Sequence, residues 1–176
     1  MTEIQSLSVA QMDAALPDLS SLLHACVQAG ASISFVLPFS IEDAAAFWTE
    51  KVRPGVAAGT RVLLVARHND AITGTVQLDI ATPPNQPHRG DVCKLMVHPD
   101  ARRQGTARAL MLALEAEARR LGRTLLTLDT RTGDGAEPLY TGLGYQTVGI
   151  IPNFALNTAR DGLHGTTIMF KALPAA

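Results

Sequence analysis

The chain has 176 residues, of which 47% are apolar and 18% are charged, and its formal net charge is −1. This length suits one ordinary domain, and the apolar fraction is large enough for a core, so extensive disorder is excluded. A net charge near zero is untypical of nucleic-acid-binding proteins, which need a basic surface to neutralise phosphates. We therefore expect one domain over residues 1–176, with any positive site confined to a small region.

Metal, disulfide and membrane features are not predicted. Cys26 and Cys93 lie far apart without a CxxC motif, and no two of the five histidines have the spacing of metal ligands. The first residues are partly acidic and form no apolar run, so we expect no signal peptide. Nowhere do 18 apolar residues follow one another, which excludes a spanning helix. The expected protein is cytoplasmic and binds neither nucleic acid nor a membrane.

The first quarter of the chain predicts mainly helices. Residues 3–9 predict a weak strand, and residues 16–29 carry leucines at helical spacing. Ser40, with an aspartate three places later, resembles a capping box. A second helix should follow it and end near Pro54 or Gly59.

A strand hairpin is expected next. Residues 60–68 form an apolar, β-branched run that ends at the turn pair Asn69-Asp70, and residues 71–81 alternate in character. Gly74 within the second strand indicates a bulge or a close approach of another backbone.

Strands and helices alternate in the second half. The predicted elements are a strand at 89–99, a helix at 105–122, a strand at 124–130, a short helix at 134–143, a strand at 145–151, a polar loop at 152–165 and a last strand at 166–173. In the long helix, Glu115 is expected largely off the apolar face. This order predicts an α+β fold with a mixed, mostly antiparallel sheet of about six to seven strands and helices on both faces.

The most informative stretch is residues 91–111, where a strand runs through an arginine-rich turn into a helix that Gly105 opens. Backbone N–H groups at a helix start lack intrahelical partners, and together with the helix dipole they form an anion site. Glycine permits a close approach of the backbone to a pyrophosphate, and Arg102, Arg103 and Arg108 add positive charge. A solvated basic helix start that binds nothing is the alternative.

The pattern Arg102-x-x-Gly105-x-Ala107 resembles the R/Q-x-x-G-x-G/A signature of the GNAT superfamily, whose helix N-terminus holds the pyrophosphate of coenzyme A. LYTGLGY at 139–145 is similar to a late element of that superfamily. The resemblance implies one acyltransferase domain with acetyl-CoA as co-substrate and no metal. The implied cofactor-binding residues are Met96, Val97, Arg102, Arg103, Gln104, Gly105, Thr106, Ala107 and Arg108, with an amide near Met96 or Val97 stabilising the thioester oxygen.

Several segments, among them KLMVHPDARRQG, LLTLDT and LHGTTIMFK, resemble the tabtoxin resistance proteins, a bacterial group within this superfamily. That resemblance implies direct acetylation of a small-molecule amine, assisted by two carboxylates. The matching residues are Asp91 and Asp129, and Asp91 is one methylene shorter than the glutamate of the relatives. Tyr140 matches the tyrosine that faces the sulfur of coenzyme A and can protonate the leaving thiolate.

Each candidate catalytic residue has a structural alternative. Asp129 ends an apolar strand, where it could accept the proton of an attacking amine or could cap the following turn. Asp91 could be an exposed charge at a strand end, and Tyr140 could be a core residue. Cys93 has no histidine nearby in sequence that would activate it as a nucleophile.

The acceptor is less well defined by the sequence. The loop 30–40 is expected to cover it, and His164 to line its side of the site. The alternatives to a small-molecule acetyltransferase are an inactive acyl-CoA-binding sensor and an acetyltransferase acting on a protein N-terminus or lysine. The expected assembly is a monomer or a homodimer.

Overall fold

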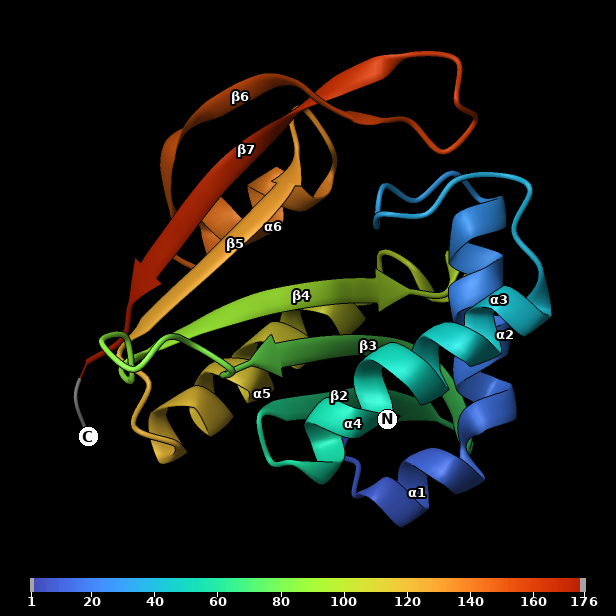
Figure 1. Ribbon diagram of the computed structural model, residues 1–176, viewed down its shortest axis with the longest axis horizontal. Coiled ribbons are helices and arrows are strands. Elements are labelled where there is room, and N and C mark those ends of the chain that lie inside the picture. Colours follow the sequence, from blue (N-terminus) through green and yellow to red (C-terminus); the bar gives the residue numbers. More distant parts are fainter. Residues whose placement is uncertain (1, 175–176) are drawn as a thin grey trace.

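The computed structural model describes residues 2–174, and their seven-stranded sheet has the order β1-β2-β3-β4-β5-β7-β6 (Figure 1). Of the neighbouring pairs, only β4 and β5 run parallel. The predicted fold class, a mostly antiparallel α+β sheet with helices on both faces, is confirmed. The strands are β1 (Glu3–Ser6), β2 (Arg61–His68), β3 (Ala71–Asp79), β4 (Arg89–Val97), β5 (Leu125–Arg131), β6 (Gln146–Leu156) and β7 (Leu163–Ala172).

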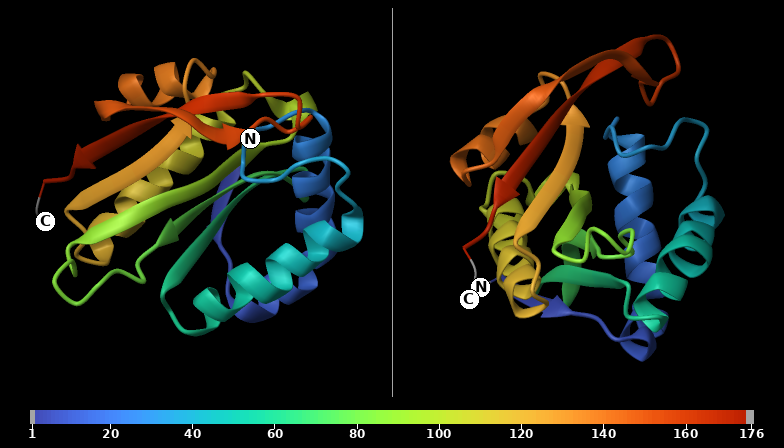
Figure 2. Two further views of the ribbon diagram at one scale, coloured as in Figure 1. Left: turned by 45° about the horizontal axis from the view of Figure 1, so that its top comes forward. Right: turned by 60° about the vertical axis from the view of Figure 1, so that its left-hand side comes forward.

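One face of the first four strands is covered by the N-terminal helices (Figure 2). These are α1 (Val9–Ala14), α2 (Leu16–Gln28), α3 (Ile41–Ala46) and α4 (Arg53–Ala57), and the π-helical turn η1 (Phe47–Val52) joins the last two. Ser40 forms the predicted capping box with Asp43. Pro54 does not end the helical region, because it lies in the first turn of α4, where its missing N–H has no intrahelical partner.

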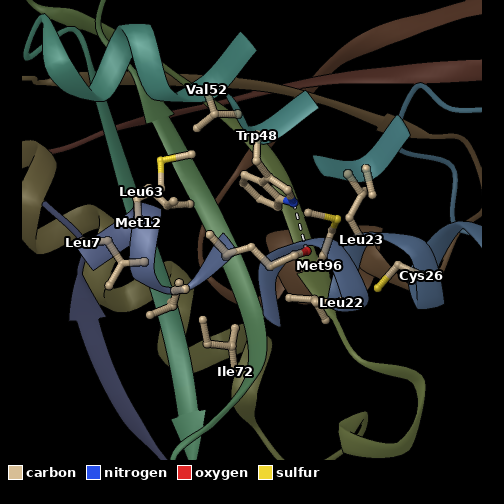
Figure 3. Packing of buried hydrophobic residues seen from close by; sticks show 14 of the residues in the cluster. Leu7, Met12, Leu22, Leu23, Cys26, Trp48, Val52, Leu63, Ile72 and Met96 are labelled. Atoms are coloured by element: carbon tan, nitrogen blue, oxygen red, sulfur yellow. Dashed lines mark hydrogen bonds between the residues drawn. The ribbon is translucent and has the colours of Figure 1, made fainter. Parts of the chain in front are cut away.

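The core under these helices is built around Trp48, which is fully buried (Figure 3). Its indole N–H donates to the carbonyl oxygen of Leu19 at 2.9 Å, which satisfies the one polar group of the ring. Leucines of α2 and side chains of β2 to β4, including Met96, complete this cluster.

The opposite face carries α5 (Thr106–Arg120) and α6 (Ala136–Gly142). Contrary to the sequence expectation, Glu115 of α5 is buried, with only 2% of its surface exposed. Both of its carboxylate oxygens lie 2.7 Å from the ammonium nitrogen of Lys171 in β7. The buried surface of α5 is thus wider than its apolar periodicity predicts, and an ion pair between residues distant in sequence lies within it.

The hairpin of β2 and β3 has the predicted turn, in which Asn69 and Asp70 both have positive φ. A bulge interrupts the pairing near Gly74, and a Cβ at this glycine would lie 2.9 Å from the carbonyl oxygen of Met96. Both predicted reasons for this glycine are therefore present.

The last two strands are longer than predicted. Residues 152–165 were expected to form a loop, but β6 continues to Leu156 and β7 begins at Leu163. A register irregularity between Ile151 and Ala155, with Asn153 in the left-handed region, breaks the alternation that sequence patterns rely on. The predicted polar loop is thus largely a bulged hairpin.

The central strands diverge from one another. β4 and β5 pair only from Arg89–Leu125 to Asp91–Thr127, after which they separate (Figure 1). β4 also bulges at Lys94, whose φ is +52°. The 3-10 turn η2 (Pro99–Ala101) then leads to α5. This splay opens the sheet at its centre.

Candidate active site

A cleft of about 1210 Å³ occupies the splay between β4 and β5. The cleft is lined by residues 91–95 of β4, by residues 127–136 of β5 and the segment that follows it, and by the loop 29–36, which follows α2. Five of the predicted site residues share this cleft: Asp91, Asp129, Tyr140, Arg102 and Arg103. Segments far apart in the sequence therefore meet in one concave site.

The two faces of β5 divide its side chains. Leu126 and Leu128 are buried in the core beneath α5, so Thr127 and Asp129 project from the opposite face, toward the loop 29–36. We call this the cleft face of β5.

Asp129 is exposed at the end of β5. The hydroxyl of Thr166 lies 3.0 Å from its Oδ2 and also 3.0 Å from the carbonyl oxygen of Thr130. One hydroxyl proton cannot serve both acceptors fully, so the carboxylate retains capacity to accept a further proton or hydrogen bond.

Asp91 is held differently, near the point where β4 and β5 part. Its Oδ1 accepts hydrogen bonds from the Arg89 guanidinium and from the hydroxyl of Thr127. Arg89 is itself anchored by Gln86 at 2.7 Å. The carboxylate of Asp91 thus already has a cation and a hydroxyl as partners, whereas Asp129 has no cation partner within residues 2–174.

Tyr140 lies in α6 with its ring against Tyr145, at 5.8 Å between ring centroids. It is buried yet borders the cleft. Burial, followed by the negative charges of Asp134 and Asp129, raises the pKa of Tyr140 well above its usual value. The phenol therefore stays protonated at neutral pH and can act as a donor.

The turn before α5 has the backbone geometry of an anion site. Arg103 and Gly105 have φ of +59° and +82°, and alternation of this kind turns backbone N–H groups toward one side. No side chain caps the first turn of α5 from its N-cap residue, Gly105. The N-terminal amides of the helix are thus available to an anion, as the sequence predicts.

The other predicted cofactor residues contribute backbone or local charge. Gln104 and Thr106 border a separate hollow of about 490 Å³, so their side chains face away from the cleft. His98 N–H donates to Thr73 of β3, and strand alternation therefore directs the Met96 amide to β3 and the Val97 amide to the splay. Ala107 and Arg108 lie in the first turn of α5, with Arg108 exposed.

Two segments, the loop after α2 and the β6–β7 hairpin, form a roof over the cleft. The sequence predicted only part of it, the loop 30–40 and His164. The loop after α2 and the β6–β7 hairpin meet here (Figure 2), where Thr158 donates to the carbonyl of Ala31 at 3.1 Å and accepts from the amide of Leu37 at 2.9 Å. Ser32 Oγ lies 2.9 Å from His164 Nε2, and Nδ1 of that ring lies 3.0 Å from the carbonyl of Gly165. A carbonyl only accepts, so in the neutral ring Nε2 accepts from Ser32. His164 borders the cleft as expected, but Ser32 and Thr158 carried no motif that would reveal them.

Neither a reactive thiolate nor a cluster of metal ligands is found within residues 2–174. Burial raises the pKa of the Cys93 thiol to about 11, so it is not a thiolate at neutral pH. Within residues 2–174, no three histidine, cysteine, aspartate or glutamate side chains are grouped to hold a metal ion. In the same range, no helix is long and apolar enough to span a membrane.

Comparison with known proteins identifies the family to which this chain belongs. The Acetyltransferase (GNAT) family matches residues 30–145, a span that holds the predicted signature, both carboxylates and Tyr140. An uncharacterised N-acetyltransferase from the hisH-hisA intergenic region of Azospirillum brasilense is 32% identical over 125 residues, which cover 70% of this chain and 72% of that protein. The chain therefore belongs to the GNAT acetyltransferase family, and it is an acyltransferase.

Solved structures agree on the fold. The structure of yncA from Salmonella typhimurium with its cofactor acetyl-CoA has a TM-score of 0.78 at 19% identity, covering 99% of this chain and 95% of that one. The ribosomal-protein-alanine N-acetyltransferase from Brucella melitensis also has a TM-score of 0.78, at 20% identity, covering 97% of this chain and 99% of its own. At these identities the likeness concerns the fold alone.

Proposed function

We propose that this acyltransferase moves an acetyl group from acetyl-CoA directly to the amine of a small molecule. The observation that carries the proposal is the single cleft that Arg102, Arg103, Asp129 and Tyr140 share between the splayed strands. The bound acetyl-CoA of the Salmonella relative supports the choice of co-substrate. Tabtoxin resistance proteins, which the sequence resembles in several segments, support a small-molecule acceptor.

The residues at the start of α5 fit a pyrophosphate. The uncapped amides of the helix and the left-handed Arg103 and Gly105 supply N–H donors, and Arg102 and Arg103 supply charge within the cleft. Acetyl-CoA would bring the activated thioester, and the Val97 amide, which faces the splay, would stabilise the charge that develops on the thioester oxygen.

Asp129 and Tyr140 would handle the protons. An amine is protonated at neutral pH and must lose a proton before it can attack a thioester, and Asp129 is the carboxylate free to accept it. Tyr140 donates to the departing thiolate. Because its pKa is raised above that of a thiol, it stabilises the thiolate by a hydrogen bond rather than by complete proton transfer.

The roof favours a small acceptor over a folded protein, because the loop 29–36 is bonded to the β6–β7 hairpin across the cleft. A protein N-terminus is the second candidate, since the chain shares its fold with the ribosomal-protein-alanine N-acetyltransferase from Brucella. An extended N-terminus would have to thread under the roof.

Calorimetry with acetyl-CoA is the first test, with an expected Kd of about 1–50 µM, or roughly −6 to −8 kcal/mol. Arg102→Ala combined with Arg103→Ala should weaken binding at least about tenfold. Arg120→Ala, which removes one exposed charge at the far end of α5, is the matched control and should have no effect.

Acetyl transfer is then assayed over amines, amino acids and peptides with free N-termini. Acetylation of small amines supports the proposal, whereas acetylation of peptides alone supports the second candidate. Acetyl-CoA binding without transfer to any acceptor would identify a sensor, and no binding at all would remove the proposed function.

A further inference from the structure

Lys94 is a cation of the cleft that the proposed chemistry does not use. It lies at the bulge of β4 with φ of +52°, and a bulge re-aims a side chain relative to the strand's alternation. Its ammonium donates to the carbonyl oxygen of Ile33 at 2.7 Å and to Ser34 Oγ at 2.9 Å. An ammonium has three N–H donors, so one remains for another acceptor.

The charge of Lys94 has no carboxylate partner among the described residues, 2–174, within ion-pair distance. Three other partly buried cations of this protein do have such a partner: Arg61 pairs with Asp79, Arg89 with Asp91 and Lys171 with Glu115. A half-buried cation without a counter-ion is unfavourable unless an anion arrives to pair with it.

The environment of Lys94 agrees with this. Burial lowers the pKa of Lys94, while the negative charge of Asp129 acts in the opposite direction. The ammonium also lies 5.4 Å from the ring centroid of Phe35 in the loop 29–36. Lys94 and Asp129 both line the cleft, and the Lys94 ammonium is bonded to the loop 29–36, toward which Asp129 also projects. The cleft therefore contains both a cation and a carboxylate near this loop.

We propose that the acceptor is an amino-acid-like zwitterion whose carboxylate accepts the third N–H of Lys94 while its amine lies at Asp129. This inference rests on the proposed function and names the class of amine that it uses. Two-point recognition of this kind orients the amine toward the thioester and rejects amines without the carboxylate, because the Lys94 charge would then stay unpaired.

A purely structural role is the competing explanation, since Lys94 also ties β4 to the loop 29–36. Ser34→Ala separates the two roles, because it removes one of the bonds to the loop and leaves the cation in place. If Lys94 only positioned the loop, Ser34→Ala and Lys94→Met would affect all acceptors alike.

The experiment compares kcat/KM for amino acids with kcat/KM for the matching decarboxylated amines and carboxamides. The wild type should favour the carboxylate-bearing acceptor by about 10- to 100-fold. Lys94→Met should lose about that factor for the carboxylate-bearing acceptor and change less than about threefold for the decarboxylated one. Lys94→Arg should retain part of the preference, and Ser34→Ala should keep it.

Three results would overturn the inference while leaving the proposed function intact. They are equal wild-type rates with and without the carboxylate, an equal loss for both acceptors in Lys94→Met, and weaker acetyl-CoA binding in that variant. Even if Lys94→Met does not fold, equal wild-type kcat/KM values for the amino acid and its decarboxylated amine would overturn the inference. Failure to acetylate any amine would instead remove the proposed function, and this inference with it.

Discussion

Asp129 and Asp91 have the same side chain and line the same cleft, but their hydrogen-bond partners differ. The carboxylate of Asp91 is paired with Arg89 and Thr127, whereas that of Asp129 shares a single hydroxyl with a backbone carbonyl. Both partners of Asp91 bind the same carboxylate oxygen and one of them is a cation, so this carboxylate is already engaged, whereas Asp129 is open to the cleft. The proposed proton acceptor is therefore Asp129, and Asp91 orients its surroundings.

Asp129→Asn should lower turnover by about 10²- to 10⁴-fold at neutral pH, because the variant retains shape but cannot accept a proton. Acetyl-CoA affinity should be unchanged, and the defect should shrink as pH rises and more amine is free. Asp91→Asn is the matched control and should lose less. The measurement is a pH–rate profile of each variant. A profile of Asp129→Asn identical to that of the wild type would mean that water or Asp91 accepts the proton.

Tyr140→Phe should lower kcat by about 10²-fold and leave acetyl-CoA affinity intact, because only the hydroxyl that meets the thiolate is lost. The pKa of Tyr140 is raised, so its protonated form persists as pH increases past the usual phenol range. The rate should thus show no loss from Tyr140 ionisation between about pH 9 and 11, where an ordinary tyrosine would ionise. A fall in that range that Tyr140→Phe abolishes would contradict this assignment.

At the scale of elements, α5 depends on two different features: the backbone conformation of Gly105 at its start, and the ion pair of Glu115 with Lys171 toward its end. Its start requires Gly105 in the left-handed region, where φ is +82°, although a Cβ there would meet nothing within 4 Å. The conformation, rather than space within the protein itself, therefore selects glycine. Residues with a Cβ pay about 1–2 kcal/mol in this region, and β-branched ones are outliers.

Gly105→Val should weaken acetyl-CoA binding by more than tenfold, because relieving the strained backbone turns the amides away from the pyrophosphate. Gly149→Ala in β6, where an added Cβ also meets nothing within 4 Å and φ is not positive, is the control. Calorimetry together with thermal unfolding separates lost binding from lost folding. Normal binding by a folded Gly105→Val would mean that the pyrophosphate lies elsewhere.

Glu115→Ala should lower the free energy of unfolding by about 3 kcal/mol, because it leaves the largely buried ammonium of Lys171 without its counter-ion. The control on the same helix is Glu117→Ala, whose partner Arg120 is largely exposed, and it should change stability by less than about 1 kcal/mol. Urea unfolding of both variants makes the comparison. Glu115→Leu with Lys171→Met should recover much of the loss, since neither charge remains.

At the scale of the whole molecule, the roof joins the N-terminal helices to the C-terminal hairpin. Thr158→Val should lower the free energy of unfolding by about 1–3 kcal/mol and raise KM for the acceptor, because the carbonyl of Ala31 loses its donor. Faster hydrogen exchange at the amide of Leu37 should accompany this. Thr49→Val, which alters an exposed hydroxyl in η1, is the control. Unchanged exchange at Leu37 in Thr158→Val would show that the roof does not depend on this bond.

Local features were predictable because neighbouring residues decide them. The Ser40 capping box, the Asn69-Asp70 turn and the Gly105 helix start all lie where the sequence indicated. Helix caps and tight turns depend on side chains within a few residues and on φ preferences, which can be read along the chain. The bulged hairpin after Ile151 was missed because a bulge shifts the alternation that predicts a strand.

The sequence by itself therefore determined the class of fold, and its patterns and family resemblance predicted the anion-binding turn and the candidate catalytic residues. Only the tertiary structure decided which of those residues are free to act. The Asp91 carboxylate is bonded to Thr127, which lies 36 residues later in the chain. In the roof, Thr158 is bonded to Ala31, which lies 127 residues earlier. Such pairs form when segments distant in sequence are brought side by side by folding, so they cannot be predicted from the periodicity of the sequence. The absence of a carboxylate partner for Lys94 within residues 2–174 became visible for the same reason, since a missing counter-ion shows only in the folded chain.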